Sequence, residues 1–258
     1  MSVTGQRILG ALLFAPVIVA FLISQSAAQW MLFGIAGVMV WEFTSMARLS
    51  MPLRFTLLMD FALFALPAPV FLHLEMVAGM SLLPVLAALA ALVVLFVWMT
   101  VRDVVVTGLS VAMIACILAG RGILGTDNGH WLFLSVAAIV ASCDIAAYFS
   151  GRKIGGPSLA PTISPNKTRS GAVGGLVAAV VTSLALMSVM QITLAEAVIG
   201  GVIIAVLAQV GDLLESMRKR RIGVKDSGSL IPGHGGFLDR FDGYLLTLPA
   251  VYLYILTV

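Results

Sequence analysis

"ILGALLFAPVIVAFLISQSAAQWMLFGIAGVMVW", residues 8–41, contains no Asp, Glu, Lys or Arg. The stretches 76–101 and 170–195 lack the same four residue types. A helix that crosses the hydrocarbon core of a bilayer needs about 20 predominantly apolar residues, and each stretch can supply at least one such helix. Over all 258 residues only 10% are charged and 60% are hydrophobic, whereas a soluble domain carries about 25% charged residues. We therefore predict an all-α polytopic membrane protein.

Polar residues, glycines and prolines divide the apolar sequence into nine predicted transmembrane helices. The breaks include "SQSAAQ" at 24–29 and "GTDNGH" at 125–130. The predicted helices cover residues 8–24, 29–47, 54–73, 79–99, 104–124, 130–151, 170–190, 194–214 and 241–258. About five of them form an N-terminal region, 1–130, and the remainder belong to a second region, 131–258.

The basic residues support this count because they fall on one side of the membrane. With nine helices, the N-terminus and the loops after the second, fourth, sixth and eighth helices share a side. Fourteen of the fifteen Lys and Arg residues lie there, namely Arg7, Arg48, Arg54, Arg102, Arg152, Lys153, Lys167, Arg169, Arg218, Lys219, Arg220, Arg221, Lys225 and Arg240. The positive-inside rule makes this side cytoplasmic and places the C-terminus outside. The cytoplasmic side then carries two long loops, 152–170 and 215–240.

The start of the chain allows a second interpretation. Arg7, the apolar residues 8–23 and the small residues of "SQSAAQ" also fit a cleavable signal peptide. The apolar stretch is long for such a signal, and we favour an uncleaved first helix. The later loops keep their sides in either case.

The two cysteines and several glycines favour structural roles. Cys116 and Cys143 both lie in apolar segments, where free cysteine behaves as a small buried hydrophobe, so we expect neither a disulfide nor a zinc site. Gly174–Gly175 and Gly200–Gly201 lie inside predicted helices, where small residues allow close helix packing.

An acidic residue marks the end of the sixth predicted helix. Asp144 lies about two turns inside the membrane end of this helix, and Tyr148 lies one turn further on the same face. A carboxylate at such a depth is a candidate functional group, although a structural pair between two helices is the alternative. The proline-rich loop that follows is predicted to present Lys167.

A second polar group lies at the cytoplasmic end of the eighth predicted helix. Its members share one helix face because they follow an i, i+3, i+4, i+7 pattern: Asp212, Glu215, Ser216 and Lys219. The basic run 218–221 comes next, and its alternative interpretation is an anchor that fixes topology or contacts anionic lipid.

The densest polar stretch is "GVKDSGSLIPGHGGFLDRFDGY", residues 223–244, which also contains six glycines. Its candidate functional residues are Lys225, Asp226, His234, Asp239, Arg240 and Asp242. Asp239 and Asp242 are three apart at the start of the ninth predicted helix, so both can point the same way, although the helix dipole alone would account for one acid there. Carboxylates from two helices can hold Mg²⁺ together with substrate phosphates, and glycines let backbone amides approach an anion. This combination suits phosphoryl or nucleotidyl transfer.

These residues resemble the signature of the bacterial phosphatidate cytidylyltransferases, also called CDP-diacylglycerol synthases. The matching positions within 216–242 are Ser216, Lys219, Arg220, Lys225, Asp226, Pro232, His234, Gly235, Gly236, Asp239, Arg240 and Asp242. "LAPTISPNKT" at 159–168 and "DIAAY" at 144–148 are similar to two further motifs of that family. The chain departs from the family pattern at Arg169, where Trp is common, and at Ile145, where a small or hydroxyl residue is usual.

The resemblance implies an enzyme of phospholipid biosynthesis in the bacterial inner membrane, with its active site facing the cytoplasm. Its reaction joins CTP and phosphatidic acid to give CDP-diacylglycerol and pyrophosphate, without nucleic acid. The resemblance also implies Mg²⁺, with K⁺ as a second cation, on Asp212 and Asp239, and it implies a homodimer. The implied catalytic residues are Asp144, Lys167, Ser216, Lys219, Arg220, Lys225, Asp226, His234, Arg240 and Asp242. The region 131–258 is then the catalytic region.

Three alternatives stay open at this point. Asp144 and Asp212 could line the ion path of a transporter, although the polar residues crowd one membrane face. A CDP-alcohol phosphotransferase would place several acids on one helix, whereas Asp242-Gly243 is followed only by apolar residues. A non-catalytic relative that binds nucleotide or lipid is the third, and the complete polar set argues against it.

Overall fold

The computed structural model describes residues 15–46, 104–224, 226–228, 230–231 and 235–257, together with Leu58, Val70 and Val94. Apart from those three single positions, the predicted helices 54–73 and 79–99 lie outside the described residues. The same holds for several basic and site residues of the sequence prediction, namely Arg7, Arg48, Arg54, Arg102, Lys225, Pro232 and His234.

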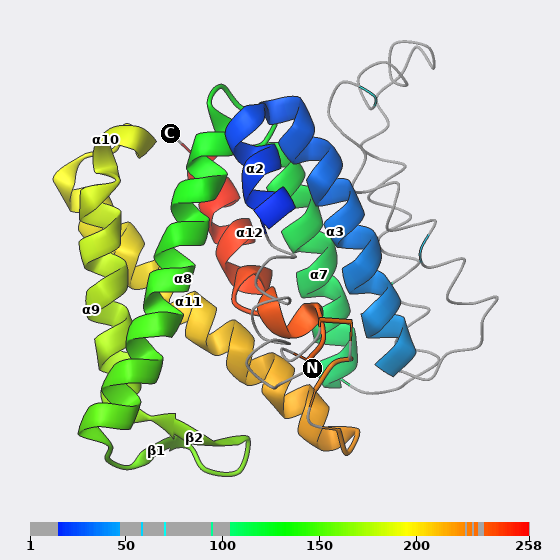
Figure 1. The fold of residues 1–258 in the computed structure, drawn as a ribbon, viewed down its shortest axis with the longest axis vertical. Coiled ribbons are helices and arrows are strands. Elements are labelled where there is room, and N and C mark those ends of the chain that lie inside the picture. Colours follow the sequence, from blue (N-terminus) through cyan, green and yellow to red (C-terminus); the bar gives the residue numbers. More distant parts are fainter. Residues whose placement is uncertain are drawn as a thin grey trace.

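The described part of the chain is mostly helical (Figure 1). Its α-helices are α2 (Ala15–Ile23), α3 (Gln25–Met46), α7 (Val104–Ile123), α8 (Gly129–Ile154), α9 (Arg169–Ala185), α10 (Met187–Met190), α11 (Leu194–Arg221) and α12 (Tyr244–Ile255). A two-stranded antiparallel sheet, β1 (Ser158–Ala160) and β2 (Ser164–Thr168), follows α8, and a 3₁₀ turn, η1 (Leu238–Arg240), precedes α12. Within this part, α8 and α11 are long and apolar enough to cross a membrane. The helical class is confirmed, whereas the number of spans stays a prediction.

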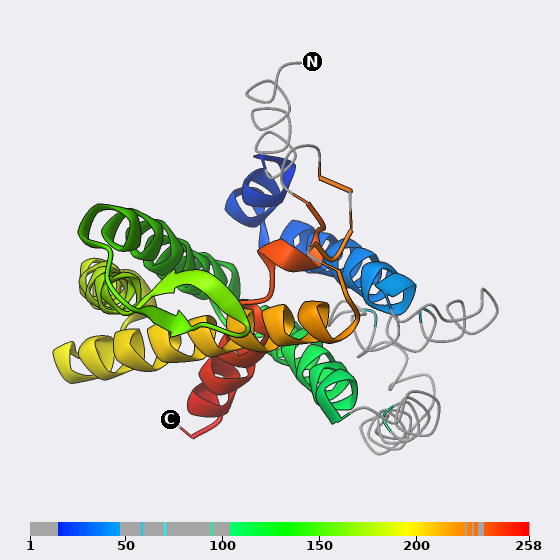
Figure 2. The same ribbon diagram turned by 90° about the horizontal axis from the view of Figure 1, so that it is seen from below.

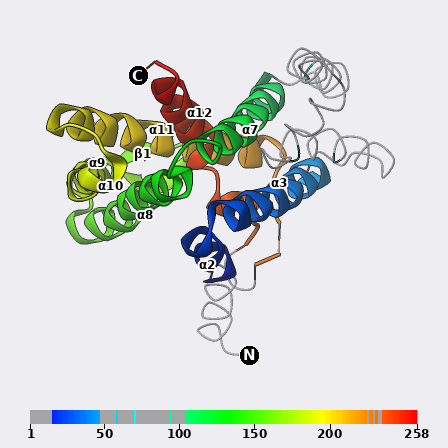
Figure 3. The same cartoon turned by 90° about the horizontal axis from the view of Figure 1, so that it is seen from above.

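Helix α8 packs against α9 and α11, while α12 packs between α7 and α11 (Figure 3). The predicted role of the glycines is confirmed at three of four positions. A Cβ placed on Gly175 would lie 2.8 Å from the carbonyl oxygen of Cys143, and one on Gly201 would lie 2.8 Å from Cα of Val180. Gly174 likewise faces Ser150, whereas Gly200 has open space around it.

The predicted break at 24–29 is present but shorter than expected, because only Ser24 separates α2 from α3, which begins at Gln25. The Nε2 groups of Gln25 and Gln29 donate to the carbonyl oxygen of Leu124 at 2.6 and 2.8 Å. These amides cap the end of α7, where four carbonyl groups lack a partner within the helix. Their polarity therefore serves a contact between helices and does not mark a loop.

Other boundaries also differ from the prediction. Helix α11 continues to Arg221, seven residues beyond the predicted end, and α12 begins at Tyr244. Thr193 and Glu196 form a capping box at the start of α11, and Gly223 follows its end with a φ of 74°. The predicted helix 170–190 is divided at Leu186 into α9 and α10.

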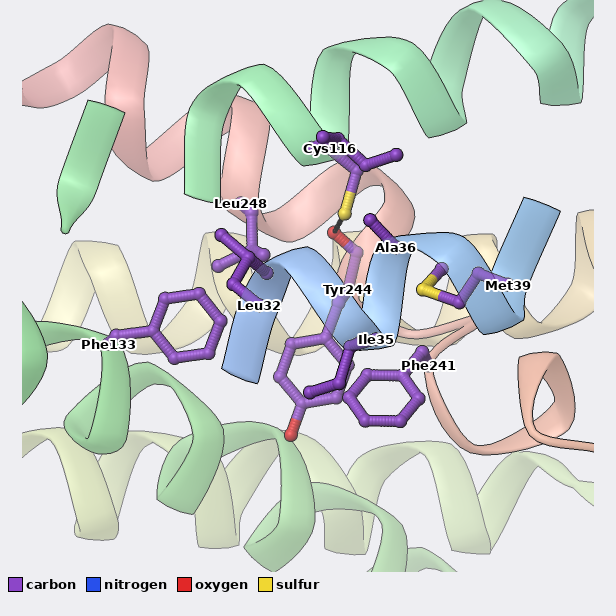
Figure 4. Close-up of a pocket in the computed structure, with 10 residues that line it drawn as sticks. Leu32, Ile35, Ala36, Met39, Cys116, Phe133, Phe241, Tyr244 and Leu248 are labelled. Atoms are coloured by element: carbon purple, nitrogen blue, oxygen red, sulfur yellow. Dashed lines mark hydrogen bonds between the residues drawn. The ribbon is translucent and has the colours of Figure 1, made fainter. Parts of the chain in front are cut away.

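The apolar core joins α3, α7, α8 and α12 around a small cavity of about 20 Å³ (Figure 4). Leu32, Phe133 and Leu248 line it from three helices, together with Tyr244. The Sγ atom of Cys116 lies 3.4 Å from the carbonyl oxygen of Tyr244. Both cysteines are free and buried, as expected for small apolar residues. This core packs around the start of α12, where Tyr244 and Leu248 contribute to it.

Candidate active site

A cavity of about 660 Å³ lies between α8, β2, α11 and the segment before α12. Its charged lining residues are Asp144, Arg152, Lys167, Asp212, Lys219, Asp226, Asp239, Arg240 and Asp242. Every member of this set except Arg152 is a predicted site residue. The structure therefore brings together side chains from sequence segments up to 98 residues apart, from Asp144 to Asp242.

The predicted polar face of α11 is confirmed. Asp212 and Lys219 line the cavity, and Ser216 donates from Oγ to Oδ1 of Asp212 at 3.4 Å. Glu215 does not line the cavity. Its side chain is only 1% exposed, and its carboxylate forms an ion pair with Lys219 at 2.5 Å. On α8, Asp144 and Tyr148 both line the cavity, which confirms that they share a helix face.

The hairpin β1–β2 carries Lys167 to the cavity and lies between α8 and α11 (Figure 2). The ammonium group of Lys167 forms an ion pair with the carboxylate of Asp212. Two contacts anchor the hairpin. Arg220 donates from Nε to the carbonyl oxygen of Ile163 at 3.3 Å, and the Thr168 hydroxyl accepts from the first turn of α9. The predicted loop that presents Lys167 is therefore a short sheet held to α11.

Asp239 is held by the most hydrogen bonds in the described site. Its Oδ1 accepts from the ammonium group of Lys219 at 2.7 Å, and its Oδ2 accepts from the backbone amides of Ser227 and Gly236 at 2.9 Å each. Burial alone would raise the pKa of Asp239, but the hydrogen bond from Lys219, its charge and the two amides lower that pKa below its ordinary value. Asp239 is therefore a fixed carboxylate.

The predicted location of Asp239 and Asp242 in the first turn of the last helix is wrong. Asp239 belongs to η1, and Asp242 lies in the turn that precedes α12. Gly211 of α11 allows this turn to approach, since a Cβ at that position would lie 2.5 Å from the carbonyl oxygen of Asp242. The helix-dipole explanation for Asp239 also fails, because its carboxylate is bound to Lys219 and to loop amides.

The basic run at the end of α11 is not a uniform lipid anchor. The side chain of Arg218 is 1% exposed; its guanidinium lies 3.8 Å from the ring centre of Phe43 and donates to the Phe43 carbonyl oxygen at 2.9 Å. Arg218 therefore joins α11 to α3. Arg220 holds the hairpin, as described above, and it is not among the lining residues of the cavity.

The donor set of the cavity fits a hard divalent cation. Asp144, Asp212 and Asp242 all line the cavity and supply carboxylate oxygens, the ligands that Mg²⁺ prefers. Among the residues that the structure describes, no three His, Cys, Asp or Glu side chains form a group that could hold a metal ion. A cation here would therefore rely on one or two carboxylates and on phosphate oxygens, as Mg²⁺ commonly does.

Sequence reasoning missed Glu42, a side chain of α3 that is 3% exposed and contacts the segment carrying Asp239. A usable signal was present, because Glu42 is an acid inside a predicted membrane helix, as Asp144 is. Gln209 was also missed; it lines the cavity and donates to the carbonyl oxygen of Ala172 at 3.2 Å.

Comparison with known proteins adds a family and several relatives. Residues 5–258 match the model of the cytidylyltransferase family. A phosphatidate cytidylyltransferase of Brucella suis biovar 1 (strain 1330) is 47% identical over 127 residues, which are 49% of this chain and 47% of that protein. A phosphatidate cytidylyltransferase of Staphylococcus saprophyticus subsp. saprophyticus is 42% identical over 134 residues, 51% of this chain and 52% of that protein. The matched part thus spans about half the length of these curated relatives.

Proposed function

Because the chain belongs to the cytidylyltransferase family, we propose that it converts CTP and phosphatidic acid to CDP-diacylglycerol and pyrophosphate in phospholipid biosynthesis. Relatives that are 42–47% identical over half of the chain carry the name phosphatidate cytidylyltransferase. The same family membership disfavours the CDP-alcohol phosphotransferase alternative.

The structural observation that carries this proposal is the mixed charge of one cavity. Four basic side chains, Arg152, Lys167, Lys219 and Arg240, line it together with the five carboxylates. Both proposed substrates are polyanions, so the site must bring like charges together. Its volume of about 660 Å³ lies within the range of about 300–1,000 Å³ that is usual for small-molecule sites.

In the proposed reaction a phosphatidate oxygen attacks the α-phosphorus of CTP. The bond between this phosphorus and the oxygen that leads to the β-phosphate breaks, and pyrophosphate leaves with the bonding electron pair. Lys167 and Arg240 would bind phosphate oxygens, Arg240 in a two-point arrangement. Glu215 and Asp239 hold Lys219 in a fixed position beside them. An ionised phosphate nucleophile needs no general base; Lys225 and His234, outside the described residues, stay predicted phosphate ligands.

Asp212 and Asp239 are the residues that we propose to hold Mg²⁺, with K⁺ as the second cation of the centre. Mg²⁺ would neutralise the negative charge on the phosphate oxygens and on the leaving group. Asp212 forms an ion pair with Lys167, Asp239 forms one with Lys219, and both carboxylates line the cavity. Asp144 and Asp226 would complete the cation shell or position the lysines.

Family membership and the apolar helices α8 and α11 make the chain a membrane protein. We further propose nine spans in the inner membrane, a cytoplasmic active site and a homodimer. The location follows from the substrates, because the acyl chains must stay in the lipid while CTP arrives from the cytosol. The basic residues on the predicted cytoplasmic side would attract both anionic substrates.

A direct assay tests the function. Purified protein in mixed micelles receives CTP, dioleoyl phosphatidic acid and Mg²⁺, and both pyrophosphate and CDP-diacylglycerol are measured. We expect equal amounts of the two products, and none when diacylglycerol replaces phosphatidic acid. Asp144→Asn tests a lining carboxylate, and Glu196→Gln, at the far end of α11, is its matched control. Absence of product with CTP and every other nucleotide and lipid tried would reject the proposal and favour a non-catalytic relative or a transporter.

A further inference from the structure

Glu42 lies on α3 and is separated by more than 180 residues from the loop that carries Asp239. One of its carboxylate oxygens, Oε2, accepts two hydrogen bonds from that loop. The Ser227 hydroxyl donates at 3.1 Å and the Leu238 backbone amide donates at 2.7 Å. Since the Glu42 side chain is 3% exposed, these bonds are shielded from water.

Both donors connect directly to Asp239. The backbone amide of Ser227 donates to Oδ2 of Asp239 at 2.9 Å, and the Ser227 hydroxyl accepts from the Asp239 amide at 3.3 Å. Leu238 is the residue that precedes Asp239. Glu42 therefore fixes the backbone on both sides of the Asp239 carboxylate, while Lys219 fixes the carboxylate itself at 2.7 Å.

Two glycines shape the space for this carboxylate. A Cβ on Gly228 would lie 2.5 Å from Oε1 of Glu42, and one on Gly236 would lie 2.9 Å from Oε2. The 3₁₀ turn η1 lies beside α3 (Figure 2), which is the contact that brings Glu42 to the loop. The fit of the carboxylate between these glycines leaves little freedom for the loop to shift.

We propose that Glu42 is a positioning residue, which sets the Asp239 carboxylate in its working place through Ser227 and Leu238. This inference rests on the proposed function, in which Asp239 serves the reaction. Glu42 does not line the cavity, so it acts only through the loop. Hydrogen-bond partners of this kind typically change activity by about 10–100-fold when they are removed.

Kinetic measurements on three Glu42 variants separate the effect of side-chain length from the effect of its negative charge. In Glu42→Ala we expect kcat to fall about 100-fold while KM for CTP and for phosphatidic acid stays within about threefold. Glu42→Gln keeps an oxygen at the same reach and should retain kcat within about tenfold of the wild type. Glu42→Asp keeps the charge but is one carbon shorter, so it should resemble Glu42→Ala. Gln29→Ala, a buried polar change at the other end of α3, is the matched control and should leave kcat unchanged.

A second measurement does not depend on turnover. Amide hydrogen exchange of the full-length protein without substrate should quicken by about tenfold in residues 235–243 of Glu42→Ala, and stay unchanged in α8. If Glu42→Ala fails to fold, Ser227→Ala, which removes only the hydroxyl link, is measured in the same way. Unchanged exchange in 235–243 would overturn the inference, as would normal kcat in Glu42→Ala or equal activity of the Gln and Asp variants. A wild type without product would instead reject the proposed function, and the exchange result would still decide the role of Glu42 in the loop.

Discussion

Lys219 is the cation on which the buried part of the site depends, and its removal should destabilise the protein strongly. Its ammonium group lies 2.5 Å from Glu215 and 2.7 Å from Asp239. The three side chains are only 12%, 1% and 7% exposed, respectively. Lys219→Met keeps the length of the side chain but removes the ammonium group that contacts both carboxylates. Removing one partner of such a buried pair costs about 3–5 kcal/mol.

This loss corresponds to a fall of about 6–20 °C in the thermal midpoint of a chain of this size. Tryptophan fluorescence in detergent micelles measures the midpoint, and Lys153→Met, at an exposed position of α8, is the control. The double variant Lys219→Met/Glu215→Gln also removes one of the two carboxylate charges that Lys219 contacts. It should therefore recover about 1–3 kcal/mol relative to Lys219→Met. The reasoning is refuted if Lys219→Met loses less than about 1 kcal/mol, or if the double variant shows the sum of both single losses.

Three further predictions concern the same site. Gly236→Ala should lower both stability and activity, because the added Cβ would clash with the Ser227 hydroxyl and the amide nitrogen of Gly228. The thermal midpoint and the turnover rate are measured, and Gly200→Ala is the control because a Cβ there has open space. Chelation with EDTA should stop turnover without unfolding, and Mg²⁺ should restore it; turnover that persists in EDTA would contradict the cation role. The pKa of Asp239 is lower in the folded protein than in the unfolded chain, where it is about 3.9. The ionised carboxylate therefore stabilises the folded state fully above about pH 3.9, and this contribution is lost as the pH falls through the lower folded-state pKa. The midpoint measured from pH 6 to pH 2 should fall less steeply in Asp239→Asn than in the wild type.

Local periodicity predicted the parts of the site that lie on single helices. The spacing of Asp212, Ser216 and Lys219 placed them on one face of α11, and Asp144 with Tyr148 shared a face of α8. These inferences needed only the helical repeat. The clustering of Asp239 and Asp242 near α11 was also predicted, although neither residue belongs to α12.

The remaining features depend on contacts between distant segments. Gln25 and Gln29 suggested a loop by their polarity, yet their partner Leu124 is 95–99 residues away. Arg218 belonged to a run that suggested a lipid anchor, but Phe43 of α3 binds it. Periodicity within one segment contains no information about such partners. A hydropathy scale also mispredicts these positions, since it assigns the same value to a polar side chain that is buried and hydrogen-bonded as to one that is exposed.

The balance of charge explains why the site draws on so many segments. Among the described lining residues, five carboxylates (Asp144, Asp212, Asp226, Asp239 and Asp242) face four cations (Arg152, Lys167, Lys219 and Arg240). With all of them ionised, the described lining carries a net charge of −1, which does not attract a polyanion. Lys167 pairs with Asp212, and Lys219 pairs with Asp239. A divalent cation would change the sign of this balance to +1. Under the proposed function, carboxylates on α8, on α11 and before α12 would serve a site for two anions by recruiting the positive charge that the side chains alone do not supply.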